Sequence, residues 1–254
     1  MTTSRKAPSL MQRIRTLEPA PPWNLTSAMV AILIAMALFI LGSIPVGVWA
    51  PDQPYALLAG WCLGATATTY FVARTRSKPD QRLALKMQPA TPLPVIAFIG
   101  FTLALSVDLL AIVVTGQFLP AAELASLVQP TVNSFHWVVA MAFALFLQPI
   151  AEGVVFRGLL LPVLRARLGA WPGILVAAAA SAVFHIAIYA SAYANASNLS
   201  SVWYGVVTPF IAAVIFGMVR AATGSTRTAI VAQSAFGLFA LVKVIYLISS
   251  VPPA

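Results

Sequence analysis

Long apolar stretches, separated by short polar segments, run through the whole chain. Each is long enough to cross a bilayer as an α-helix, which takes about 20 mostly apolar residues. They lie at about 25–49, 55–73, 92–116, 136–168, 171–191, 203–221 and 228–249. The pattern predicts an all-α fold, a polytopic transmembrane helix bundle of about seven spans. Residues 25–254 are expected to form this single transmembrane domain, and residues 1–24 a cytoplasmic or interfacial tail.

The fourth stretch, 136–168, is too long for one upright span and contains Pro149. It is either one long helix that is kinked or tilted, or two shorter pieces. Basic residues help to decide, because Lys and Arg collect in cytoplasmic loops. With seven crossings and the N-terminus inside, the segments 50–54, 117–135 and 192–202 face outward, and they contain no Lys or Arg.

The basic clusters that flank the spans then all lie on the cytoplasmic side. Two full crossings within the fourth stretch would instead put the last cluster outside. The charges therefore favour seven crossings, a cytoplasmic N-terminus and a C-terminus on the opposite side. These clusters are Arg5, Lys6, Arg13 and Arg15; Arg74, Arg76, Lys78, Arg82 and Lys86; Arg165 and Arg167; and Arg220 and Arg227.

The composition also indicates a membrane protein. The chain has 254 residues, of which 60% are hydrophobic and only 8% charged, whereas a soluble domain has roughly 25% charged residues. Its net charge of +9 is accounted for by topology and by attraction to anionic lipids, so membrane lipids are expected partners and nucleic acid is not. We expect an integral membrane protein, most simply of a bacterial plasma membrane. The single Cys62 excludes an intrachain disulfide.

The segment before the first span offers two interpretations. Leu10, Met11, Ile14 and Leu17 form the apolar edge of a short interfacial helix, or they belong to a disordered tail.

Ionisable side chains within the apolar stretches are expensive to bury and are by default functional candidates. Glu152 and His185 each lie roughly 20 Å from the cytoplasmic end at the rise of an α-helix, so they can meet on adjacent spans. A carboxylate beside an imidazole can hold and polarise a water, with Glu152 as general base. Gln148 lies four residues earlier and shares the face of Glu152. Arg157 lies about 140° around an α-helix from Glu152, so it is expected to find another partner or to extend toward the inner surface.

Two further residues complete this set of buried polar groups. Asp108 lies at a comparable depth and is expected to form a structural ion pair with Lys243 or Arg157. His136 lies near the outer boundary of its span, where an interfacial position is expected.

Three short motifs carry a resemblance to a known family. The segment Glu152–Gly158 reads Glu-Gly-Val-Val-Phe-Arg-Gly, His185 lies in the next span with Ser181 four residues before it, and Gln233 is followed four residues later by Gly237. These motifs resemble those of the CAAX protease and bacteriocin-processing (CPBP) family of intramembrane endopeptidases. The family's motifs are Glu-Glu-x-x-x-Arg, Phe-x-x-x-His, and His-x-x-x-Asn or Asp.

The resemblance implies that Glu152 activates a water and that His185 is its partner. Gln233 and Gly237 stand where the family has the His and the Asn or Asp that bind this water or stabilise the oxyanion. Gln233 can donate a hydrogen bond but cannot shuttle a proton, and Gly237 has no side chain. Because Gln233 and Gly237 replace these residues, the third motif is degenerate. In the first motif, Gly153 replaces the second Glu.

Three functions stay open for the CPBP-like core at about 136–240. The changes at positions 153, 233 and 237 favour a catalytically impaired member that binds another integral membrane protein, a peptide or a lipid-like molecule as an accessory subunit. The retained Glu152 and His185 favour an active intramembrane endopeptidase. A small transporter or proton relay would use Asp108 and Lys243 as well, but the chain shows no internal repeat of the transporter kind. No cofactor or metal is expected, because a catalytic zinc usually has three protein ligands.

Overall fold

The computed structural model describes residues 8–50, 53, 55–128, 132–189 and 198–250, and in these ranges the secondary structure is helical, without strands. Among the described residues, seven helices are long and apolar enough to cross a membrane, which confirms the predicted all-α bundle. Five of the spans are single helices: α2 (Leu25–Trp49), α3 (Ala56–Thr75), α5 (Leu93–Thr115), α9 (Ala170–Tyr189) and α12 (Thr226–Ser250).

The two other spans are composite. The fourth joins α6 (Ser134–Ala142), η2 (Phe143–Leu147), α7 (Gln148–Glu152), η3 (Gly153–Leu160) and α8 (Leu161–Leu168). The sixth joins α10 (Asn198–Val202), η5 (Trp203–Val207) and α11 (Thr208–Thr223). Three short elements lie outside the spans: α1 (Leu10–Arg15), α4 (Pro79–Ala84) and the 3₁₀ helix η1 (Ala122–Val128).

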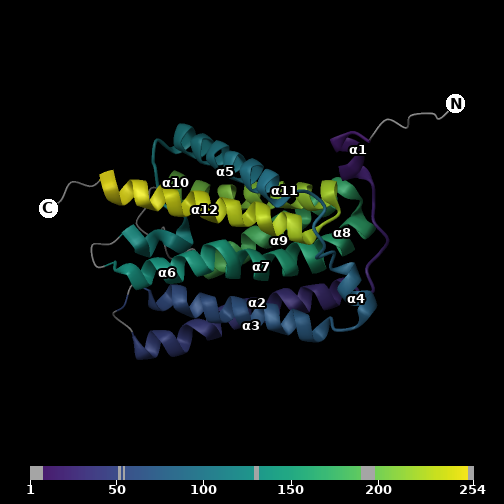
Figure 1. Ribbon diagram of the computed structural model, residues 1–254, viewed down its shortest axis with the longest axis horizontal. Helices are drawn as coiled ribbons and strands as arrows, with labels where there is room; N and C mark the ends of the chain where they lie inside the picture. The colour runs from purple at the N-terminus through teal and green to yellow at the C-terminus, as the bar shows by residue number, and fades with distance from the viewer. Residues whose placement is uncertain (1–7, 51–52, 54, 129–131, 190–197, 251–254) are drawn as a thin grey trace.

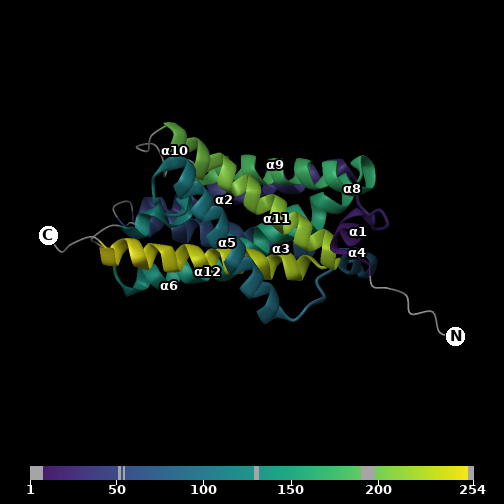
Figure 2. The same cartoon turned by 90° about the horizontal axis from the view of Figure 1, so that it is seen from above.

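The fourth span lies between two helix pairs. Figure 1 shows α2 and α3 side by side along one edge of the bundle and α5 beside α12 along the opposite edge, with α6 and α7 between them. Figure 2 shows α9 and α11 side by side on one face of this arrangement. The fourth span therefore has neighbours on several sides, and more than half of its most apolar window is buried within the bundle.

The fourth span is one continuous helical stretch of 35 residues, which decides between the two interpretations of its length. Pro149 lacks an amide hydrogen and cannot donate in the helix ladder. It lies at the start of α7, directly after the π-helical segment η2. A π-helical turn loosens the ladder and accommodates such a local interruption.

The pair α2 and α3 packs backbone against backbone at three glycines. A Cβ atom added to Gly42 would lie 2.5 Å from the carbonyl oxygen of Gly60, and one added to Gly64 would lie 2.5 Å from the Cα atom of Phe39. Real Cβ contacts are not this short, so only glycine fits. Small residues at helix contacts permit this close approach in membranes.

The N-terminal segment is folded against the bundle. α1 begins with a capping box in which Ser9 and Gln12 cap each other, and Ile14 is buried while Leu10 and Met11 remain exposed. Of the two interpretations of this segment, the structure therefore shows the short helix, over Leu10–Arg15.

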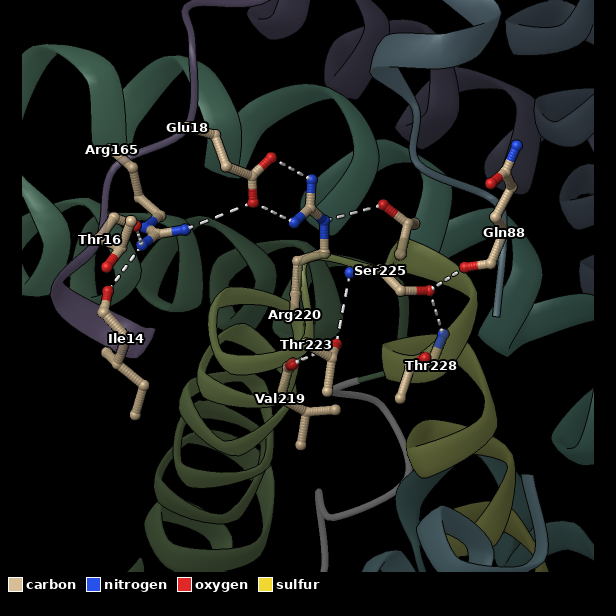
Figure 3. Close-up of polar contacts among 11 residues, drawn as sticks. Ile14, Thr16, Glu18, Gln88, Arg165, Val219, Arg220, Thr223, Ser225 and Thr228 are labelled. Carbon is tan, nitrogen blue, oxygen red and sulfur yellow. Dashed lines mark hydrogen bonds and ion pairs between the residues drawn. The ribbon is translucent and has the colours of Figure 1, made fainter. Parts of the chain in front are cut away.

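Glu18 fixes this segment to two buried arginines, as Figure 3 shows. Its carboxylate accepts two hydrogen bonds from Arg220, at 2.5 and 3.0 Å, and lies 3.8 Å from Arg165. Arg165 also donates to the backbone carbonyls of Ile14 and Thr16. Both arginines belong to clusters that the sequence assigns to the cytoplasmic lipid surface, but their side chains are buried in contacts within the protein.

The segments that the sequence assigns to the cytoplasm meet at one end of the bundle. Besides the Glu18 contacts, the amide of Thr226 donates to the carbonyl of Lys86, and the Ser225 hydroxyl donates to the carbonyl of Gln88. This end, where α1, α4 and α8 lie in Figure 1, is called the basic end below. Which side of the membrane it faces stays a prediction from the distribution of Lys and Arg.

Candidate intramembrane site

A cavity of about 140 Å³ lies within the bundle, and it brings the predicted polar residues together. Helices α5, α7, α9, α11 and α12, together with η1, η3 and η5, contribute to its walls. The residues predicted from sequence that line it are Gln148, Glu152, Arg157, His185, Gln233 and Gly237, with Asp108 and Lys243.

Glu152 is buried and its carboxylate accepts three hydrogen bonds. Gln148 Nε2 and the Tyr189 hydroxyl donate to Oε1, at 3.1 and 3.4 Å, and Gln233 Nε2 donates to Oε2 at 2.7 Å. The bond from Gln148 follows from its position one helical turn earlier. The bonds from α9 and α12 fix the carboxylate from two other helices, so both of its oxygens are occupied.

Arg157 faces the same cavity as Glu152. Of the two expectations, another partner or an extension toward the inner surface, the structure shows a partner within the bundle. Its side chain is buried, its guanidinium lies 5.1 Å from the centre of the Phe216 ring, and it interacts electrostatically with Glu152. The expected angle of 140° assumes an α-helix, but residues 153–160 form the π-helical segment η3. In a π-helix, residues five apart lie one above the other, so Arg157 turns toward the side of Glu152.

His185 lines the cavity beside a carboxylate that the sequence reasoning missed. Its Nε2 lies 3.7 Å from Glu123 Oε2, and its ring packs edge-on against Tyr189 at 4.6 Å. Within the described part of the chain, no hydrogen bond joins His185 to Glu152. The contact between them runs through Tyr189, which touches both.

Glu123 comes from η1, in the segment between the third and fourth spans. Sequence reasoning placed this segment in an outward loop, but Ala122, Leu124 and Leu127 are buried and hold η1 against the bundle. Burial raises the pKa of the Glu123 carboxyl. The signal in the sequence was weak but present: Glu123 is the only charged residue of 117–135 and lies among apolar neighbours.

The glycines at the degenerate positions are tightly covered. A Cβ atom at Gly237 would lie 2.1 Å from the carbonyl oxygen of Ala144, in η2 of the neighbouring span. A Cβ atom at Gly153 would lie 2.3 Å from Ile230 Cγ1. At both positions, a residue of a neighbouring helix therefore occupies the place where a side chain would begin.

Asp108 forms its ion pair with Lys243, one of the two expected partners. Both side chains are buried, and the Lys243 ammonium also lies 4.3 Å from the centre of the Phe118 ring. His136 lies near the start of the fourth span, its side chain is buried, and its Nδ1 accepts a hydrogen bond from the amide of Asn133. Its interfacial position stays a prediction. In the ranges that the structure describes, no three His, Cys, Asp or Glu side chains are grouped to hold a metal ion.

Comparisons with known proteins agree with this arrangement. Residues 134–239 match the model of a family described as type II CAAX prenyl endopeptidase Rce1-like. No curated protein and no solved structure matches the chain significantly. The matched segment covers the spans that carry Glu152, His185 and Gln233, whereas Asp108, Glu123 and Lys243 lie outside it. Residues 134–239 are therefore similar to the Rce1-like CPBP family of membrane proteins, as the sequence resemblance predicts.

Proposed function

We propose that this protein is a catalytically impaired Rce1-like membrane protein that binds another integral membrane protein or peptide as an accessory subunit, most simply in a bacterial plasma membrane. The observation that carries the proposal is the hydrogen bond of 2.7 Å from Gln233 Nε2 to Glu152 Oε2. It ties the candidate base to the residue that replaces the family's proton-competent histidine.

A hydrolytic site of this kind needs a water against its base and a group that moves a proton. General-base catalysis requires the base within hydrogen-bonding reach of the attacking water. Here three side-chain donors already engage the carboxylate of Glu152. The amide of Gln233 can donate a hydrogen bond but cannot accept and return a proton near neutral pH.

The oxyanion side of the site is weakened as well. Removing one oxyanion donor typically slows catalysis by about 100- to 1,000-fold. Gly237 supplies no side chain, and the carbonyl of Ala144 occupies the place where a side chain would begin. The close packing supports a scaffold adapted to its altered residues, in which binding takes the place of catalysis.

The test compares the wild type with Glu152→Gln, which keeps the size of the side chain but removes the base. Both are expressed as full chains in membranes, and new N-termini of membrane peptides are quantified together with proteins recovered after crosslinking. We expect identical peptide profiles and the same partner, recovered in a fixed ratio with both chains.

Equal expression and equal thermal melting of the two chains serve as the folding control. A cleavage product that accumulates with the wild type and disappears with Glu152→Gln would contradict the proposal. It would support the second candidate function, an intramembrane endopeptidase.

That second candidate has one observation in its favour. Glu152 and His185, the two residues to which the family resemblance assigns water activation, line a single cavity. A ligand that displaced Gln233 from Glu152 would free one carboxylate oxygen for a water. The experiment above separates the two functions, since only the protease depends on the carboxylate of Glu152 for product formation.

A further inference from the structure

The charges around the cavity do not balance without one more positive charge. Among the described residues that line it, Asp108, Glu123 and Glu152 are acids, whereas Arg157 and Lys243 are the permanent cations. Lys243 pairs with Asp108, and Arg157 is the charged neighbour of Glu152. Glu123 is left without a permanent counter-charge. A buried charge without a partner costs several kcal/mol, so this third acid has to be neutralised.

His185 is placed to supply that charge when the cavity is otherwise empty. Its Nε2 lies 3.7 Å from Glu123 Oε2, and this oxygen is shielded from solvent and has no hydrogen-bond partner in the described structure. A proton held by the pair of Glu123 and His185 makes the cavity neutral. Burial favours this state, since it raises the pKa of the Glu123 carboxyl.

The free acceptors of the cavity show which ligand could replace the proton. Glu123 Oε2 is one of them. Gln233 Oε1 is another, because Gln233 uses its Nε2 on Glu152 while its buried oxygen has no partner. A ligand that satisfies both needs several N–H donors and a positive charge. A primary ammonium group has three donors and one charge, whereas a quaternary ammonium has no donor.

Aromatic rings favour the same chemistry. Phe216 and Tyr204 already contact the two permanent cations of the cavity through their ring faces. Phe236 and Phe239 also line the cavity, and neither ring lies over a cation in the described structure. The faces of such rings attract cations.

We propose that Glu123 Oε2 and Gln233 Oε1 form a binding site for a primary ammonium group, which enters in exchange for a proton held by Glu123 and His185. The ammonium takes over the positive charge, and the displaced proton passes to solvent, so the charge of the cavity is unchanged. This inference rests on the proposed function, because it treats the cavity as a binding site and names the class of its ligand.

The exchange fixes the direction of the pH dependence. The proton and the ammonium compete for one negative charge, so ammonium binding strengthens as the pH rises and weakens as the pH falls. The other charged or titratable groups that line the cavity are Asp108 of α5, Glu152 of α7, Arg157 of η3, Tyr204 of η5 and Lys243 of α12. Tyr189 of α9 lies close by, because its hydroxyl donates to Glu152.

The experiment uses the full chain in phosphatidylcholine nanodiscs and n-butylammonium as the probe, with titration calorimetry at about pH 8 and about pH 6. Repeating the titration in two buffers of different ionisation enthalpy counts the protons released. We expect saturable binding, tighter at the higher pH, with release of about one proton. Tetramethylammonium, which has no N–H donor, is expected to bind much more weakly.

Glu123→Gln keeps the size of the side chain and removes the exchangeable charge. It is expected to weaken butylammonium binding by about 10- to 100-fold, the range for a hydrogen bond to a charged group, and to abolish proton release. The matched control is Asp80→Asn, the same exchange on the exposed helix α4, which is expected to bind as the wild type does. Equal binding by Glu123→Gln and wild type, or binding without proton release, overturns the proposal. If Glu123→Gln does not fold, the tetramethylammonium comparison and the proton count on the wild type still decide.

The lipid composition of the nanodisc distinguishes two sources of the ammonium group. If the natural ligand is an aminolipid headgroup, phosphatidylethanolamine in the nanodisc competes with butylammonium; if it is a soluble amine or a peptide amine, the lipid has no effect. Both results support the site. The two proposals can fail separately. Glu152-dependent cleavage would contradict the accessory function even if ammonium binds, and a lack of ammonium binding would leave the accessory function standing.

Discussion

At the scale of single residues, neighbouring residues pack closely against the glycines at two motif positions, Gly153 and Gly237. The carbonyl of Ala144 lies where a side chain on Gly237 would begin, and Ile230 covers Gly153. The two positions differ in what a substitution would displace. Ile230 is a side chain that can change rotamer, whereas the contact at Gly237 is backbone, which moves only with its helix.

Gly237→Ala tests this close contact. The added methyl group would lie 2.1 Å from the carbonyl oxygen of Ala144, so α12 and η2 have to separate. We expect a loss of about 1–3 kcal/mol in the free energy of unfolding, the usual cost of overpacking, measured by thermal and denaturant unfolding in detergent.

The control is Gly47→Ala in the helix α2, where an added Cβ has nothing within 4 Å. Alanine is favoured over glycine within a helix, so this variant should be as stable as the wild type or more so. Equal stability of the two variants would show that the approach of α12 to η2 is loose. The same contact means that an Asn at position 237 cannot simply be restored to revive catalysis.

Lys243→Met tests the buried ion pair with Asp108. The substitution leaves a buried carboxylate without its partner, which typically costs about 3–5 kcal/mol. Unfolding experiments should therefore show a large loss for the single variant. The double variant with Asp108→Leu removes both charges and is expected to recover most of the lost stability. A double variant as unstable as Lys243→Met alone would mean that packing, and not the charge, sets the loss.

At the scale of secondary-structure elements, two π-helical segments shape the fourth span. η3 turns Arg157 toward Glu152, and the carbonyl of Leu159 in η3 accepts a hydrogen bond of 3.0 Å from the indole of Trp23. The N-terminal segment is thereby tied to the fourth span. Because π-helical turns are rare and often occur at functional sites, this span combines the core of the fold with the core of the candidate site.

The contact between the N-terminal segment and the bundle predicts a difference between two neighbouring arginines. Arg165 is buried and donates to the carbonyls of Ile14 and Thr16, whereas Arg167, one half-turn later, is exposed. Arg165→Gln should therefore raise the hydrogen exchange of residues 9–18, because local opening becomes easier when buried contacts are lost.

Arg167→Gln is the matched control, with the same loss of charge on the same helix. It is expected to leave the exchange of residues 9–18 unchanged, as followed by mass spectrometry of the two chains in nanodiscs. Similar exchange in both variants would show that α1 is held by its own helix caps and by Ile14 rather than by the arginine.

How well a feature could be predicted from the sequence depends on the physical constraint that fixes it. Span number and position could be predicted, because bilayer thickness imposes a length on every apolar helix. Only part of the surroundings of Glu152 could be predicted. The contact with Gln148 follows from α-helical spacing. The approach of Arg157 does not, because a π-helical turn changes which residues share a face and leaves no clear trace in composition. Glu123 was missed, because a short 3₁₀ helix buries too few apolar residues to stand out from a loop.

At the scale of the whole molecule, charge is separated along the bundle. The basic clusters gather with Glu18 at the basic end, while Glu123 and the pair of Asp108 and Lys243 lie toward the other end, near the last turns of α5 and α12. A cavity placed in this half is nearer to the outer surface if Lys and Arg face the cytoplasm. The orientation of the bundle thus decides from which side a ligand reaches the site.

Cysteine labelling tests this orientation. In a background with Cys62→Ala, single cysteines are introduced by Gln53→Cys, in the segment between α2 and α3, and by Ser77→Cys, at the other end of α3; both positions are exposed. With the basic end in the cytoplasm, a membrane-impermeant maleimide should label Gln53→Cys in intact bacterial cells and Ser77→Cys only after lysis. The reverse pattern would place the basic end outside, against the Lys and Arg distribution, and would move the entrance of the cavity to the cytoplasmic side.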